Sequence, residues 1–173
     1  MNFKRLYEIQ QVLDQRILEE HGLTREETFP KKLLALQVEL CELANETRCF
    51  KYWSRKGSAP QPKVLEEYVD ALHFVLGLGL DLGYRDVAIP QTQRFAANGD
   101  ADVNADRNTA LTAQFQTLLT HCVALATPSP DTYAMLFSEL LALGGRLGFT
   151  PDDIEAAYLA KNKKNHLRQT EGY

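Results

Sequence analysis

Residues 36–53, LQVELCELANETRCFKYW, decide how the rest of the chain is interpreted. Glu39, Glu42 and Glu46 lie three and four residues apart, so on an α-helix their carboxylates share one face. Four apolar residues also repeat at helical spacing and predict an amphipathic helix: Leu36, Leu40, Leu43 and Ala44. Carboxylates on one stripe repel each other, so this face is predicted to bind cations.

A second acidic pair, Glu67 and Asp70, has i, i+3 spacing inside the most apolar stretch, LEEYVDALHFVLGLGLDLGY at 65–84. These acids could be solvated surface residues, but the apolar neighbours leave this helix little face to expose. Two antiparallel helices would bring the pairs face to face, as in carboxylate metal sites of bundles. Because carboxylates supply hard oxygen ligands, the pattern predicts Mg²⁺ or Mn²⁺ and disfavours Zn²⁺.

A stripe of hydrogen-bond donors lies in residues 157–173, AYLAKNKKNHLRQTEGY. Lys161, Asn165 and Arg168 are four and three residues apart, so they share one helical face. Lysine binds phosphate as a point charge and arginine binds it as a two-pronged donor. A basic last turn also complements the helix dipole, which explains the charge but not the asparagine within the stripe.

Apolar periodicity and turn residues predict an all-α fold, a bundle of about five to six helices in one domain spanning 1–173. The predicted helices are residues 3–20, 30–53, 63–83, 108–125, 131–147 and 151–168. Pro30 is expected in the first turn of the second helix. Residues 89–108 are predicted to form a long polar loop. Gly77 and Gly79 are expected to allow close helix packing.

Composition narrows the functional classes. The 173 residues are 45% hydrophobic and 24% charged, which is ordinary for a globular protein. A net charge of −4 argues against binding a nucleic-acid polymer. No apolar run reaches membrane length, and the N-terminus lacks the apolar core of a signal peptide. Three cysteines without a C-x-x-C pair fit reduced thiols, so we expect a cytoplasmic protein that does not bind membranes.

The motif segments resemble the all-α dimeric dUTPases, which belong with the MazG-like nucleotide pyrophosphohydrolases. The superfamily mark is E-x-x-E, a spacer and E-x-x-D, and the matching residues are Glu39, Glu42, Glu67 and Asp70. Because the whole superfamily shares this motif, it indicates pyrophosphohydrolase chemistry but not the branch of the superfamily. The FKYW segment at 50–53 and the C-terminal donor stripe narrow the resemblance to the dUTPases, whereas residues 86–150 carry no motif.

The resemblance implies a role for each matched position. The four acids would hold Mg²⁺, and four residues would contact the substrate phosphates: Lys161, Asn165, Arg168 and Tyr173. His73 and Trp53 would lie near the uracil or deoxyribose, and Gln10 would read a uracil edge, although adjacent Gln11 leaves its register open. His73 and Trp53 also fit ordinary core positions.

The implied activity is Mg²⁺-dependent hydrolysis of dUTP to dUMP and pyrophosphate by a homodimer. One carboxylate, Glu42 in this interpretation, would orient or deprotonate the attacking water. One alternative is a related pyrophosphohydrolase acting on dCTP or a modified deoxynucleotide. A second is a non-catalytic helical module that binds a nucleotide or a protein. A di-iron bundle is disfavoured because neither acidic pair has E-x-x-H spacing.

Overall fold

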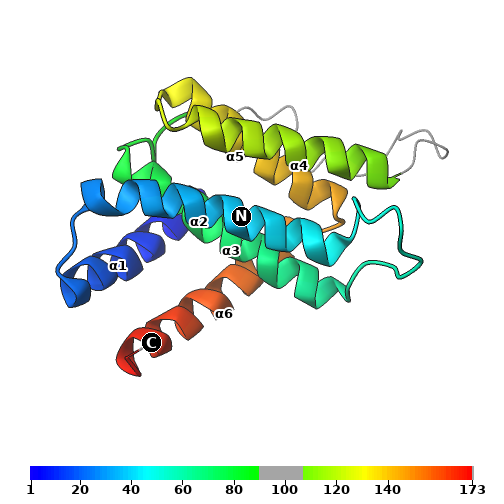
Figure 1. Ribbon diagram of the computed structural model, residues 1–173. Helices are drawn as coiled ribbons and strands as arrows, with labels where there is room; N and C mark the ends of the chain where they lie inside the picture. The colour runs from blue at the N-terminus through cyan, green and yellow to red at the C-terminus, as the bar shows by residue number, and fades with distance from the viewer. Residues whose placement is uncertain (90–106, 173) are drawn as a thin grey trace.

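The computed structural model describes residues 1–89 and 107–172, and Figure 1 shows that this part of the chain is helical. It contains six helices: α1 (Phe3–His21), α2 (Arg25–Thr47), α3 (Gln61–Asp81), α4 (Arg107–Ala124), α5 (Pro130–Arg146) and α6 (Pro151–Thr170). No strand occurs in the described ranges. The predicted all-α bundle is therefore confirmed, and five of its helices begin and end within two residues of the predicted positions.

The second helix differs from its prediction at both ends. It begins at Arg25 because the Thr24 hydroxyl accepts from the Glu27 backbone N–H while the Glu27 carboxylate accepts from the Thr24 N–H. Pro30 therefore lies inside the helix and not in its first turn. The helix ends at Thr47, since Arg48 adopts a left-handed conformation with φ 59°. Trp53 consequently lies in the connection to α3 rather than on the helix.

Helix α3 is the buried centre of the fold, as its apolar sequence predicted. It contacts α1, α2, α5 and α6, and its strongest packing is against α2. In Figure 1, α2 and α3 run antiparallel. Helices α4 and α5 cover one side of this pair, and α6 lies on the opposite side. The α2–α3 pair therefore positions both predicted acidic stretches on adjacent helices.

Two glycines let neighbouring side chains approach α3 closely, which confirms the packing prediction. A Cβ at Gly79 would lie 2.2 Å from the Tyr133 hydroxyl oxygen, and one at Gly77 would lie 3.0 Å from Asp14 Oδ2. The hydroxyl oxygens of Tyr133 and Tyr7 both lie next to Gly79 and are 2.5 Å apart. The Tyr133 hydroxyl also donates to the Val75 carbonyl at 3.1 Å.

Two predicted features lie outside the described residues. Most of the predicted loop 89–108 falls within residues 90–106, and Tyr173 is the last residue of the chain. Among the helices that the structure describes, none has the length and apolar character needed to cross a membrane.

Candidate active site

Carboxylates from α2 and α3 meet as predicted, in a group of three. One oxygen each of Glu39, Glu67 and Asp70 lies within 4.8 Å of the others. Glu39 comes from α2, and the other two lie one turn apart on α3. Glu42 is exposed and does not belong to this group. The spacing of Glu39 and Glu42 puts both on one broad face of α2, and of the two only Glu39 contributes an oxygen to this group.

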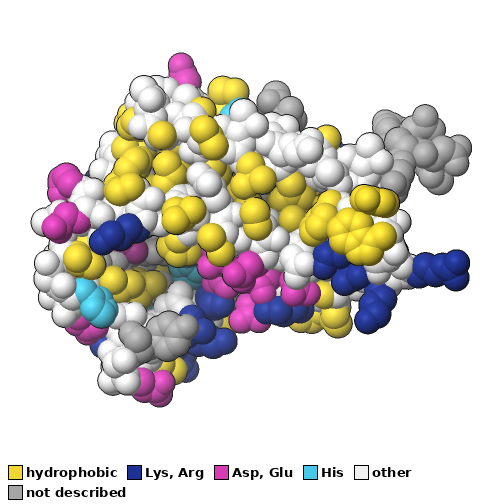
Figure 2. Space-filling model, viewed as in Figure 1, with side chains coloured by type: hydrophobic (Ala, Val, Ile, Leu, Met, Phe, Trp, Pro, Cys, Tyr) yellow, Lys and Arg dark blue, Asp and Glu magenta, His cyan; other side chains and the backbone are white. Residues whose placement is uncertain are grey.

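Lysines from two helices contact this acidic group. Lys161 of α6 places Nζ 2.5 Å from Asp70 Oδ2 and 3.3 Å from Glu66 Oε1. Lys63 pairs with Glu67 on the same face of α3. Figure 2 shows acidic side chains gathered beside lysine and arginine side chains on this face. The Lys161 contact therefore joins the predicted phosphate stripe to the predicted metal-binding acids.

The acidic group retains an excess of negative charge. Burial, followed by the charges of Asp70, Glu42 and Glu67, raises the pKa of Glu39 from its ordinary value to about 7. Burial also raises the pKa of Asp70, although Lys161 opposes this effect. Three converging carboxylate oxygens form a set that suits a hard divalent cation.

A cavity of about 380 Å³ lies next to the acids, between α1, α2, α3 and α6. Seven predicted site residues line it: Gln10, Glu39, Asp70, His73, Lys161, Asn165 and Arg168. Trp53 does not line it. Its side chain is 66% exposed and packs edge to face against Tyr52 and Phe50 in the α2–α3 connection. The structure thus brings the acids, the donor stripe and two of the three predicted base-contacting residues together.

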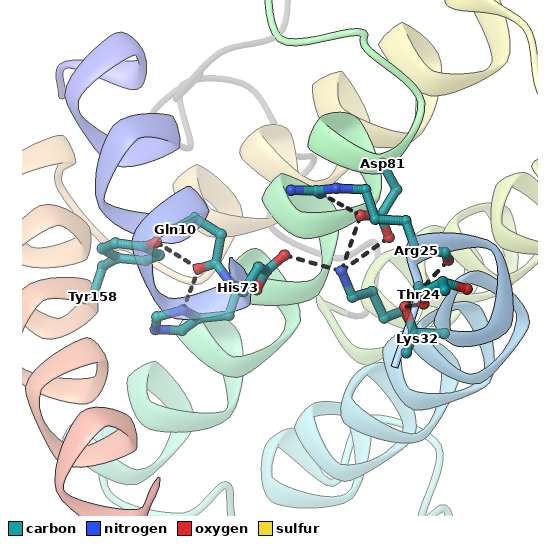
Figure 3. Close-up of polar contacts among 9 residues, drawn as sticks. Gln10, Thr24, Arg25, Lys32, His73, Asp81 and Tyr158 are labelled. Carbon is teal, nitrogen blue, oxygen red and sulfur yellow. Dashed lines mark hydrogen bonds and ion pairs between the residues drawn. The ribbon is translucent and has the colours of Figure 1, made fainter. Parts of the chain in front are cut away.

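A network of polar side chains fixes the inner end of the cavity (Figure 3). The Gln10 amide oxygen accepts from the Tyr158 hydroxyl at 2.6 Å and lies 2.7 Å from His73 Nδ1. The Gln10 amide nitrogen donates to Asp14 Oδ1 at 2.7 Å. The rings of His73 and Tyr158 are stacked, with centroids 4.1 Å apart. Gln10, the residue whose register was open, is thus the one that faces the cavity.

Ion pairs extend this network to the N-terminal end of α2. Lys32 donates to Asp14 Oδ2 at 2.9 Å and to Asp81 Oδ2 at 2.9 Å, and Arg25 donates to Asp81 Oδ1 at 2.8 Å. Sequence reasoning missed Asp14, Lys32 and Asp81. The one available signal was the spacing of Gln10 and Asp14, four residues apart and thus on one face of α1.

His73 is a neutral histidine in this network. Burial lowers the pKa of His73 to about 3, and Lys161 adds to this effect, while a hydrogen bond with the Tyr158 backbone opposes it. His73 thus links α3 to α1 through its Nδ1 contact with Gln10.

An all-α fold whose paired helices carry converging acids, with a basic helix beside them, is typical of the helical nucleotide pyrophosphohydrolases. Comparison with protein families gives the particular branch: the model of a family described as dUTPase matches residues 2–173. The chain belongs to this family of all-α dUTPases, and its activity is the hydrolysis of dUTP to dUMP and pyrophosphate. A comparison with curated proteins found no match. The family match favours the dUTPase interpretation over a dCTP-hydrolysing relative or a non-catalytic module.

Proposed function

We propose that the cavity between α1, α2, α3 and α6 is the active site, with the base at its inner end and the triphosphate at the acidic group. The observation that carries this proposal is the contact of Lys161 with Asp70 at the edge of the cavity. It brings a phosphate-type donor from α6 against a metal-type acid from α3. The base and the phosphates would then lie along one continuous surface.

Mg²⁺, or Mn²⁺ in its place, would be held by Glu39, Glu67 and Asp70, with Glu42 adjacent. The fit rests on the donor set, three carboxylate oxygens within 4.8 Å. When bound, the ion would neutralise triphosphate charge and lower the pKa of a coordinated water. On the protein's side, the carboxylates would fix the position of the cation relative to α6.

Glu42 remains our candidate for the carboxylate that orients or deprotonates the attacking water. It is exposed, and none of the ion pairs among the described residues involves it. A general base must lie within reach of water, and an exposed glutamate one turn from Glu39 is so placed. Glu39 is less suited, because its neighbours and its burial already oppose its ionisation.

The phosphates would be bound by residues of α6. Lys161, Asn165 and Arg168 all line the cavity from this helix, and Arg168 Nη1 lies 3.5 Å from Asn165 Oδ1. Lys161 would exchange its carboxylate partners for phosphate oxygens as charge accumulates on the leaving group. The resemblance also implies a phosphate contact for Tyr173, which lies outside the described residues. Trp53 does not line the cavity of its own chain, so we assign it no role there.

Homodimerisation forms a separate part of the proposal. Leu34 and Val38 lie one turn apart on the outer side of α2, and they are 62% and 46% exposed. Exposed apolar surface marks an interaction site when it forms a contiguous patch, and we place the dimer contact on this stripe of α2. Light scattering of the purified protein should give twice the chain mass, and Leu34→Lys should reduce it to that of one chain. A wild-type monomer would refute this part alone. The predicted cytoplasmic location stays a prediction.

Product analysis tests the catalytic proposal directly. The purified protein should release pyrophosphate from dUTP in the presence of Mg²⁺, and chelation of the metal should abolish this release. The panel should also contain dCTP, dTTP, UTP and dUDP, so that the preference for base, sugar and chain length is measured together. Asp70→Asn should abolish turnover, whereas Lys164→Met, which removes an exposed lysine outside the cavity, should not. Full turnover by Asp70→Asn would refute the proposed site.

A further inference from the structure

The ammonium group of Lys161 lies between two carboxylates of α3. Its Nζ atom is 2.5 Å from Asp70 Oδ2 and 3.3 Å from Glu66 Oε1. The two acids are four residues apart, so they lie one turn apart on the same face of the helix. The side chains of Lys161 and Asp70 are 11% and 14% exposed, whereas that of Glu66 is 38% exposed. One ammonium therefore has a nearly buried partner and a more exposed one.

The two partners of Lys161 line different hollows of the protein. Asp70 lines the active-site cavity, and Glu66 lines a separate groove between α3 and α6. Among the described residues, Lys161 alone lines both. A lysine ammonium sits on a flexible four-carbon stem. A small movement of this group is therefore enough to exchange one carboxylate for the other while both helices stay in place.

A divalent cation at the acidic group would require only one of these partners. Asp70 contributes an oxygen to the group of three carboxylates, and Glu66 does not. A cation bound to Asp70 would lie close to the Lys161 ammonium, and the two positive charges would repel each other. The ammonium must then give up Asp70. Without a second partner it would become an unpaired charge in a nearly buried position, which is strongly unfavourable.

Glu66 is held where it can receive this ammonium. Its Oε2 atom lies 3.6 Å from Lys63 Nζ on α3, and its Oε1 atom lies 3.5 Å from Lys164 Nζ on α6. Both of these lysine side chains are about half exposed, so solvent weakens their pairing with the carboxylate. Lys161 is nearly buried and gains more from the same carboxylate. The exposed lysines thus fix the position of Glu66 without competing strongly for it.

We propose that Glu66 is a positioning residue for Lys161: it takes over the ammonium when a divalent cation occupies Asp70, and keeps it at the edge of the cavity for a phosphate group. This inference rests on the proposed function, because it needs the cation at Asp70 and the phosphates beside α6. Lys161 and the cation compete for Asp70, and Glu66 makes the displacement of Lys161 easier. Glu66 therefore strengthens cation binding through Lys161 and not through its own charge alone.

A double-mutant cycle on Mn²⁺ binding tests this coupling in the full-length protein without nucleotide. Electron paramagnetic resonance measures free Mn²⁺ during the titration. Glu66→Gln should raise the Kd for Mn²⁺ about tenfold, the lower end for a charged hydrogen bond because Glu66 is partly exposed. In a Lys161→Met background the same substitution should raise it only about 2–3-fold, the effect of one exposed charge. Equal effects in the two backgrounds would overturn the proposal, because a charge acting alone needs no lysine.

The matched control is Lys164→Met, which removes an α6 lysine from Glu66 and leaves Lys161 in place. It should change the Kd for Mn²⁺ by no more than about twofold. If it weakened Mn²⁺ binding as much as Glu66→Gln does, Glu66 would only tie α6 to α3, and the proposal would fail. Lys161→Met alone should bind Mn²⁺ more tightly than the wild type, since the competing ammonium is gone. Weaker binding by the folded variant would contradict the competition.

A crystal structure of the wild-type protein with Mn²⁺ and no nucleotide gives a test that needs no variant. Lys161 Nζ should contact Glu66 and should have left Asp70. An ammonium still bound to Asp70 beside the metal, or an Asp70 that binds no metal, would overturn the proposal even if dUTP is hydrolysed. Failure to hydrolyse dUTP would instead refute the proposed function and leave the transfer of Lys161 between the two carboxylates intact.

Discussion

Glu39→Gln should make the metal-free protein more stable at pH 8 and leave its stability at pH 5 nearly unchanged. Folding raises the pKa of Glu39 from about 4.5 to about 7, with burial as the largest cause and neighbouring acids next. Below pH 4.5 the side chain is protonated in both the folded and the unfolded state. Between pH 4.5 and pH 7 the unfolded state loses this proton first, so folding stability falls as pH rises. Glutamine has no proton to lose and removes this part of the pH dependence.

The size of the effect follows from the shift. Each pKa unit corresponds to about 1.4 kcal/mol, so the full shift would correspond to about 3 kcal/mol. Glu39 is only partly buried, and solvent screening reduces the expected difference to about 1–2 kcal/mol. In a domain of this size, that difference changes the melting temperature by about 2–8 °C.

Thermal unfolding in a metal chelator, recorded at pH 5 and pH 8, measures this difference. Glu8→Gln, which removes an exposed acid of α1, serves as the control and should follow the wild type at both pH values. Saturating Mg²⁺ should reverse the order at pH 8, because the cation favours the ionised carboxylate. If Glu39→Gln and the wild type unfold at the same temperature at pH 8 without metal, the acidic group is not under electrostatic stress and this reasoning fails.

Three further substitutions test other parts of the site and the core. Glu42→Gln should lower kcat by about 10²–10⁴-fold with unchanged unfolding temperature, and near-normal turnover would remove Glu42 from the reaction. Arg168→Ala should raise KM for dUTP about 10–100-fold, the loss expected for a charged hydrogen bond, so an unchanged KM would place it outside the phosphate site. Gly79→Ala should destabilise the protein by about 1–3 kcal/mol in chemical denaturation, because its Cβ overlaps the Tyr133 hydroxyl, whereas Gly57→Ala meets no atom within 4 Å and should be neutral.

The spacing of residues along the sequence predicted the features that are set within a single helix. The E-x-x-E and E-x-x-D pairs indicated helix faces, and three of the four acids do meet. Glu42 is exposed and contributes no oxygen to the group, although its charge still acts on Glu39. The T-x-x-E pattern of Thr24 and Glu27 is itself a sequence signal for the start of α2, whereas the preference of proline for first turns points wrongly to Pro30. Arg48, the left-handed residue that ends α2, carries no such sequence signal because it is not glycine.

Contacts between distant residues could not be predicted in this way. Gln10 meets His73 across 63 positions and Tyr158 across 148, and no periodicity relates residues so far apart. The family resemblance identified Gln10 and His73 as site residues. It did not identify the side chains that orient them. Asp14 and Lys32 meet only because α1 and α2 both pack against α3, an arrangement that the sequence does not show.

The register between α3 and α6 would connect the two ends of the proposed nucleotide site. On α3, Asp70 and His73 are three residues apart, and their respective partners Lys161 and Tyr158 are three residues apart on α6 in the opposite direction. One helical turn, about 5 Å, therefore separates the ion pair at the acidic group from the stacked rings at the inner end of the cavity. A slip of one residue between these helices would break both contacts together, so the packing of α6 on α3 specifies the distance between the two ends of the nucleotide site. Because both contacts are set by one helix pair, a substitution that loosens this packing should impair base discrimination and phosphate binding in parallel, whereas loss of a single side chain should impair only one of them.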